Sequence, residues 1–102
     1  MNRKILDVSL RLIPTGDGGR RDAVRSGYRG LVRFEGSEID FGFELTLEAP
    51  LEASGIPPGA SGMGQLVIWA GEELPALRVG QHLQIREGTR VIGTGNLLDD
   101  PS

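Results

Sequence analysis

The residues of this sequence best suited to chemistry are the arginines between positions 20 and 33. Five of them fall in this short stretch: Arg20, Arg21, Arg25, Arg29 and Arg33. The nearest acids are Asp22 and Glu35. A planar guanidinium binds phosphate or carboxylate through paired hydrogen bonds. The pattern therefore predicts a surface that contacts the backbone of a nucleic acid or an acidic partner.

Two of these arginines also have a competing explanation within the chain. Arg29 and Arg33 are expected on the outward face of one strand, and the next strand is predicted to present a row of acids: Glu38, Asp40, Glu44 and Glu48. Opposite charges on neighbouring strands stabilise a sheet as cross-strand pairs. Such pairs would neutralise part of the arginine surface, whereas the loop arginines have no acidic neighbour in this pattern. The residues leave both interpretations open.

Other reactive side chains are scarce. The chain has one His, His82, one Lys, Lys4, and no Cys, so thiol chemistry is excluded and a zinc site nearly so. A phosphate-binding Walker loop needs a Lys at its end, and no glycine loop precedes Lys4. The sequence has no GxSxG nucleophile elbow that could supply a serine to His82, and His82 is expected to be a surface residue. The paired acids Glu72-Glu73 and Asp99-Asp100 are interpreted as solvated turns and tail. We expect no enzyme activity, no cofactor, no metal and no GTP binding.

Charge is distributed unevenly along the chain. The formal net charge is -3, but residues 1–33 carry eight basic and three acidic groups (8 - 3 = +5), which leaves -8 for the rest. Ten of the eleven cations are Arg, as expected for a recognition surface or for a GC-rich coding sequence. There is no run of about 18 apolar residues and no signal-peptide core. The sequence predicts a cytoplasmic protein that does not enter membranes.

Alternating apolar and polar residues dominate the elements that must position these groups. Period-2 runs predict a first strand over 6–12, a second over 28–35 and a third over 38–48. The residues expected to face inward are Leu6, Val8, Leu10, Leu12, Tyr28, Val32, Phe34, Ile39, Phe41, Phe43, Leu45 and Leu47. Gly-rich loops at 14–21 and 36–37 separate the strands.

The second half of the chain contains further short strands. Prolines and glycines make 49–64 an irregular connection, and 65–70 is predicted to be a strand buried on both faces. A hairpin follows, with a strand over 82–87, a turn at Gly88-Thr89 and a return strand over 91–98. Gly93 and Gly95 inside it predict a bulge or a close backbone approach. Residues 1–102 are expected to form a single domain with a core over 5–98 and a frayed tail over 99–102. About six strands without a substantial helix predict an all-β, small antiparallel closed barrel or a sandwich.

Three ordered motifs resemble a known domain. They are Gly18-Gly19-Arg20, then Gly27-Tyr28-Arg29, and finally the run IREGTRVIGTG that begins at Ile85. In order and spacing they resemble the C-terminal β-barrel, domain 3, of elongation factor Tu, where the signatures read GGR, GYR and IREGGRTVGAG. The resemblance spans about Leu6 to Leu98 and is weakest over 36–66. The family usually continues GYR with Pro-Gln, whereas this chain has Gly30-Leu31.

The resemblance implies a six-stranded antiparallel barrel and a role in contacting the translation machinery. In the parent factor this barrel packs on the GTPase domain and helps to hold the T stem of aminoacyl-tRNA. By this resemblance Arg20, Arg29, Glu87 and Gly88 fall at positions that touch or flank the tRNA. The GTPase domain and the middle barrel are absent from this chain, which implies a smaller tRNA footprint and no GTP binding.

Two functional hypotheses follow. The first is a non-catalytic, stand-alone binding module that contacts a translation-related protein, or a tRNA weakly, through these residues: Arg20, Arg21, Arg25, Arg29, Glu87 and Gly88. The second is an inhibitor or immunity-like protein-interaction module that mimics the elongation factor barrel without nucleic-acid binding. The second hypothesis would use the acidic strand and an exposed Leu31.

Overall fold

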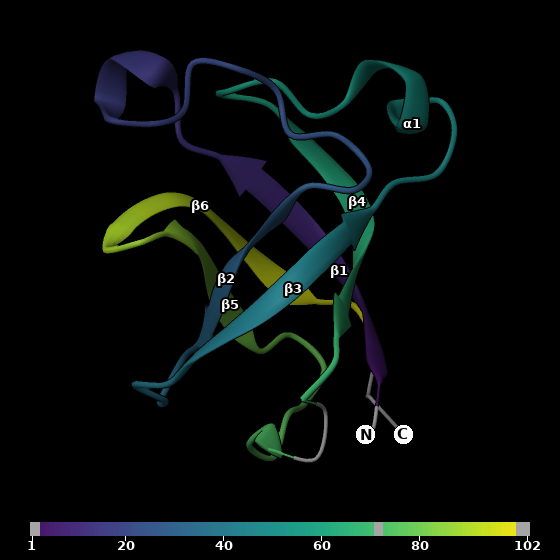
Figure 1. The fold of residues 1–102 in the computed structure, drawn as a ribbon, viewed down its shortest axis with the longest axis vertical. Coiled ribbons are helices and arrows are strands. Elements are labelled where there is room, and N and C mark those ends of the chain that lie inside the picture. The colour runs from purple at the N-terminus through teal and green to yellow at the C-terminus, as the bar shows by residue number, and fades with distance from the viewer. Residues whose placement is uncertain (1–2, 71–72, 100–102) are drawn as a thin grey trace.

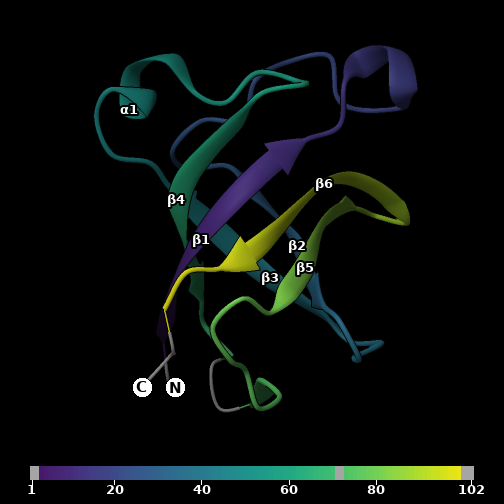
Figure 2. The same cartoon turned by 180° about the vertical axis from the view of Figure 1, so that it is seen from behind.

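Six antiparallel strands close into a barrel in the computed structural model, which describes residues 3–70 and 73–99 (Figure 1). The strands are β1 (Lys4–Leu12), β2 (Arg29–Phe34), β3 (Asp40–Thr46), β4 (Ser61–Ile68), β5 (His82–Glu87) and β6 (Arg90–Leu97). Their order around the barrel is β1-β4-β3-β2-β5-β6, and β6 pairs back with β1. Seen from behind, β1 lies between β4 and β6 (Figure 2). The predicted all-β fold and the closed six-stranded barrel are confirmed.

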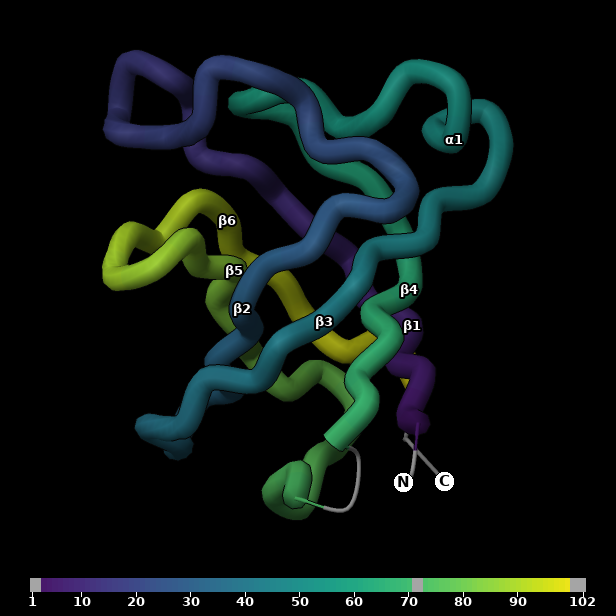
Figure 3. Tube along the Cα trace, in the orientation of Figure 1, coloured from purple at the N-terminus to yellow at the C-terminus, as the bar shows by residue number. Residues whose placement is uncertain are grey.

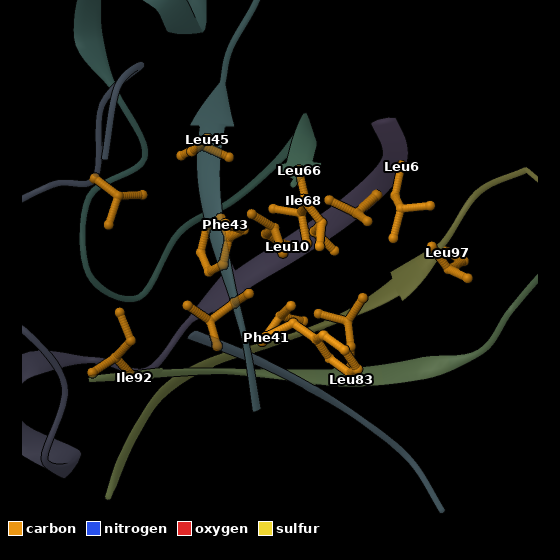
Figure 4. Close-up of a cluster of buried hydrophobic side chains, with 14 of the residues drawn as sticks. Leu6, Leu10, Phe41, Phe43, Leu45, Leu66, Ile68, Leu83, Ile92 and Leu97 are labelled. Atoms are coloured by element: carbon orange, nitrogen blue, oxygen red, sulfur yellow. The ribbon is translucent and has the colours of Figure 1, made fainter. Parts of the chain in front are cut away.

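The inward-facing residues of the alternating strands form a single core. Figure 4 shows Leu10, Phe41, Phe43 and Leu66 pointing toward one another between the strands. The full core is Leu6, Val8, Leu10, Leu12, Val24, Val32, Phe34, Phe41, Phe43, Leu45, Leu47, Ile56, Leu66, Ile68, Leu83, Ile85, Ile92 and Leu97. Each such side chain stabilises the fold by about 1.5–3 kcal/mol relative to exposure. Ile39 was predicted to face inward, but it precedes β3 and is 61% exposed.

The fourth strand begins earlier than its side chains predict. β4 begins at Ser61, within the predicted irregular connection, and pairs with β1 along its whole length. Gly62 and Gly64 occupy inward positions because neighbouring side chains fill the space: a Cβ on Gly62 would lie 2.7 Å from Leu51 Cδ1. The prediction that 65–70 is buried on both faces is wrong, because Val67 is only half-buried and Trp69 is 41% exposed.

The β5–β6 hairpin contains the predicted irregularity. The register shifts between Ile85 and Arg86, opposite the part of β6 that contains Gly93. Gly95 packs so closely on β1 that a Cβ there would collide with the carbonyl oxygen of Ser9. A Cβ on Gly93 would lie 3.0 Å from the carbonyl oxygen of Arg11. Both the bulge and the close backbone approach are confirmed. The turn at Gly88 has a φ of +60°, which glycine adopts without strain.

Two long loops cover one end of the barrel. Residues 13–28, with the short 3-10 helix η1 (Thr15–Asp17), and residues 47–60, with the single-turn helix α1 (Leu51–Ser54), pass over the same end (Figure 3). A bridge between Val24 and Ile56 joins them. Within residues 3–70 and 73–99, neither helix has the length or apolar character to cross a bilayer. The predicted tail at 99–102 falls mostly outside the described residues, as does Glu72.

Candidate functional site

Four side chains from the three motif segments meet at one end of the barrel. Glu87, at the end of β5, forms ion pairs with Arg20 and, at 3.3 Å, with Arg90. Tyr28 donates its hydroxyl proton to the same carboxylate, with 2.7 Å between the oxygens. The Arg20 guanidinium also lies 4.9 Å from the centroid of the Tyr28 ring, within cation–π range. We call these four residues the Glu87 cluster.

The motif glycines position the cluster. Gly19 is buried where a Cβ would collide with the carbonyl of Ile13, so the chain turns tightly just before Arg20. Gly27, at φ +92°, donates its backbone N–H to Leu45 at 2.8 Å and delivers Tyr28 to the start of β2. Gly30 has no side chain, which leaves room for the Tyr28 ring: a Cβ there would lie 3.0 Å from it.

The Arg20 loop is also tied to its own backbone. Thr15 donates its hydroxyl proton to the carbonyl of Arg20 at 2.5 Å, and Arg20 Nε donates to the carbonyl of Asp22 at 3.2 Å. Since Glu87 holds the end of the same side chain, Arg20 is only 23% exposed. The 13–28 loop is therefore fixed to the β5–β6 hairpin at a defined position.

Both ionisable partners at the centre of the cluster have shifted pKa values. Burial opposes the ionisation of Glu87, but hydrogen bonds from Tyr28, Arg20 and Arg90, together with the charge of Arg20, outweigh it and lower the carboxyl pKa. Burial, and then the hydrogen bond and charge of Glu87, raise the pKa of the Tyr28 phenol well above its usual 10. Glu87 is therefore ionised and Tyr28 protonated at neutral pH, so the arrangement can bind charged groups but holds no proton ready for transfer.

Two of the predicted arginines pair with the acidic strand instead. Arg29 forms an ion pair with Glu44, its register partner on β3, at 3.1 Å, and Arg33 pairs with Asp40 at 2.7 Å. Arg86 approaches the same Asp40 at 3.8 Å. The cross-strand interpretation is thus confirmed for Arg29 and Arg33. Two other acids predicted in that row, Glu38 and Glu48, form no ion pair among the described residues.

Two of the three loop arginines remain open to solvent, whereas Arg20 is paired with Glu87 although no acidic neighbour was expected for it. Arg21 and Arg25 are exposed, and neither has an ion pair within the part of the chain that the structure describes. Arg25 makes only a long hydrogen bond of 3.5 Å to the carbonyl of Ala53. Of the predicted site residues, the structure therefore brings together Arg20, Glu87 and the turn at Gly88, while Arg29 lies on the outer face of β2.

Two members of the cluster, Tyr28 and Arg90, are not among the site residues that the sequence predicts. The interpretation of Tyr28 as a core residue holds for its ring, which packs against the core, but its hydroxyl belongs to the cluster. Its place beside Arg29 in the GYR motif was the available signal. Arg90 follows Glu87 across a two-residue Gly-Thr turn, a spacing that places both side chains at the same end of a hairpin. That spacing was the available signal.

His82 lies away from the cluster. It is exposed on β5, with Nδ1 2.7 Å from Asn96 Nδ2, and lines a groove of about 570 Å³ over β2, β5 and β6. No group of three or more His, Asp or Glu side chains suited to a metal ion occurs among residues 3–70 and 73–99.

No family model matches the chain, and no curated protein matches it.

Proposed function

We propose that this chain is a non-catalytic binding module, resembling the third domain of elongation factor Tu, that contacts a tRNA or a translation-related protein around the Glu87 cluster. The main support is that the GGR, GYR and REG segments, distant in sequence, supply the side chains of one cluster. A likeness in three separate motifs that meet in space is more specific than a likeness in any one of them.

The cluster surface has donors for an anionic ligand. Glu87 neutralises one of its two arginines, so Arg20 and Arg90 leave one net positive charge. Arg90 is 55% exposed and can reach a second acceptor. Arg21 and Arg25 on the neighbouring loop add two cations without ion pairs among the described residues. A tRNA backbone or a row of carboxylates would meet these groups, and its affinity would fall steeply with salt.

A titration with fluorescein-labelled tRNA at several salt concentrations tests the RNA interpretation. We expect weak binding at low salt, with a logarithmic salt slope that the double variant Arg21→Ala/Arg25→Ala reduces by about one per lost phosphate contact. The matched control is Arg11→Ala/Arg78→Ala, which removes the same charge from exposed positions elsewhere. Absence of binding at low salt, or equal slopes in the two double variants, would reject tRNA as the ligand of this surface.

The second candidate is a protein-interaction module without nucleic-acid binding. Its support is that the side chains of Arg20, Arg29 and Arg33 are already paired with acids, which leaves fewer cations for phosphate. The half-buried Leu31 lies between the last two on the outer face of β2. Immobilised wild-type protein should then retain a specific protein that Leu31→Asp does not retain, and tRNA should fail to compete. Equal retention by both would reject Leu31 as a contact.

A further inference from the structure

A shallow slot opens on the outer face of the barrel where β3 and β4 separate. It has a volume of about 450 Å³ and is lined by Arg29, Gly30, Gly42, Phe43, Trp69 and Ala70. Gly42 leaves the base of the slot without a side chain, and a Cβ at that position would meet no atom within 4 Å. Trp69 is 41% exposed on one side, and Leu31, the register partner of Gly42, lies on the other. The slot is a neighbour of the Glu87 cluster, because Tyr28 packs against Gly30 and Phe43, which line the slot.

The charged side chains around the slot differ in their exposure to an approaching partner. Among the described residues, the ion-paired groups beside the slot are Arg29, Arg33 and Arg86 with Asp40 and Glu44, which together leave one positive charge (3 - 2 = +1). The Arg29 side chain is 78% exposed, against 32% for its partner Glu44. Arg86 is only 13% exposed and Asp40 24%. An arriving molecule therefore meets the Arg29 guanidinium first.

The geometry points to a docking site for a protein segment that presents one aromatic side chain next to a carboxylate. The aromatic ring would enter the slot over Gly42 and pack against the Trp69 indole, where offset or edge contacts add to apolar burial. The carboxylate would bind the free edge of Arg29. A nucleic-acid strand carries a charge at every phosphate, so it would meet more repulsion from Glu44 and Asp40 than a single carboxylate does. This assignment uses a different surface from the Glu87 cluster. It shares Leu31 with the second candidate function above, on which it rests, and names the kind of segment that this surface would bind.

The probe is a capped pentapeptide with a central phenylalanine flanked by glutamates, titrated into the ¹⁵N-labelled protein. We expect chemical-shift changes at Gly42, Leu31 and the indole N–H of Trp69, the only tryptophan in the chain. A dissociation constant on the order of 1 mM is expected for a single docked ring. The resonances of Arg21 and Arg25, which do not line the slot, should not shift, and this separates the test from the tRNA titration.

Two variants test the slot and its charge separately. Gly42→Val fills the floor with a side chain that suits a strand and should weaken peptide binding at least about tenfold. Thr46→Val, on the exposed face of the same strand, is the matched control and should leave the affinity unchanged. Arg29→Glu should invert the preference, so that a lysine-flanked peptide binds better than the glutamate-flanked one.

Four results would overturn the assignment. The first two are a peptide with a central alanine that binds as tightly as the phenylalanine peptide, and a Gly42→Val variant with wild-type affinity. The third is a wild-type protein that binds glutamate-flanked and lysine-flanked peptides equally. The fourth is an oligoadenylate that shifts the same resonances and binds more tightly than the peptide. The last result would assign the slot to RNA.

Discussion

At the scale of single residues, Glu87 is the acceptor on which the cluster depends. One carboxylate receives Arg20, Tyr28 and Arg90, which come from the 13–28 loop and from the far side of a hairpin turn. Hydrogen bonds to an ionised group are stronger than those between neutral groups, and removing their shared acceptor leaves partly buried donors unsatisfied. The cluster therefore has a structural role in fixing the loop, whatever its surface binds.

We predict that Glu87→Gln lowers the free energy of unfolding by about 1–2 kcal/mol at neutral pH. Because the folded state lowers the pKa of Glu87, the unfolded chain takes up the proton first as the pH falls. The stabilisation is complete above the ordinary Glu pKa of about 4.3 and is lost as the pH falls through the lower folded value. Urea unfolding at a series of pH values should show the two proteins converging below about pH 4.

The control for this prediction is Glu48→Gln, which removes the same charge from an exposed side chain without an ion pair among the described residues. It should match the wild type throughout. A stability difference between Glu87→Gln and wild type that stays constant with pH would contradict the assigned role of the carboxylate.

At the scale of the elements, glycines determine how closely neighbouring strands approach. Gly95 on β6 lies against the backbone of β1, whereas Gly42 on β3 faces open space. The same residue type therefore serves two purposes in one sheet: close packing at the first position and an empty surface at the second.

We predict opposite effects for alanine at these two positions. Gly95→Ala places a methyl group against the Ser9 carbonyl and the Leu10 and Leu83 side chains, which should destabilise the barrel by about 1–3 kcal/mol or prevent folding. Gly42→Ala meets no atom and restricts the unfolded chain, so it should be neutral or stabilising by up to about 1 kcal/mol. Urea midpoints measure both. A destabilising Gly42→Ala together with a neutral Gly95→Ala would contradict the strand packing.

The strands with alternating apolar and polar residues were predicted well. The first part of β4 was not, and the reason is physical. β1, β2, β3 and β5 present branched or aromatic side chains to the core, and β6 presents Ile92 and Leu97 on either side of two buried glycines. The first part of β4 presents Gly62 and Gly64, so its inward face carries no side chain and no pattern. The apolar groups there come from Leu51 and Ile56 on the preceding connection, which composition alone marked only as irregular.

The candidate site was predictable residue by residue but not as an arrangement. Arg20 and Glu87 were both singled out, yet 67 positions separate them, and only the closed barrel order brings β5 beside the loop that leads into β2. The pairing of Arg29 with Glu44 was foreseeable, because hairpin register fixes neighbours across a short turn.

At the scale of the whole molecule, the charge asymmetry of the sequence is partly cancelled in space. Residues 1–33 carry a formal +5 and the remainder -8, but ion pairs join the two parts at Arg20–Glu87, Arg29–Glu44 and Arg33–Asp40. Because β1 pairs with both β4 and β6, the N-terminal strand also links the two sides of the barrel.

We therefore predict a single cooperative unfolding transition. Far-UV circular dichroism and the fluorescence of Trp69 should give coincident urea curves, since every strand shares one core. Calorimetric and van't Hoff enthalpies should agree. Separate midpoints for the two probes would indicate that the β4 end of the barrel unfolds independently.

The β3–β4 pairing has a kinetic consequence. Register pairs join these strands only at Glu44, Leu45 and Thr46, whereas β1 and β4 pair over the length of β4. This short seam is the place where the barrel should open locally before it unfolds, and its amides should exchange with solvent sooner than those of β1. A ring seated between Gly42 and Trp69 would bridge the seam, so an occupied slot would slow that opening and stabilise the whole fold by mass action.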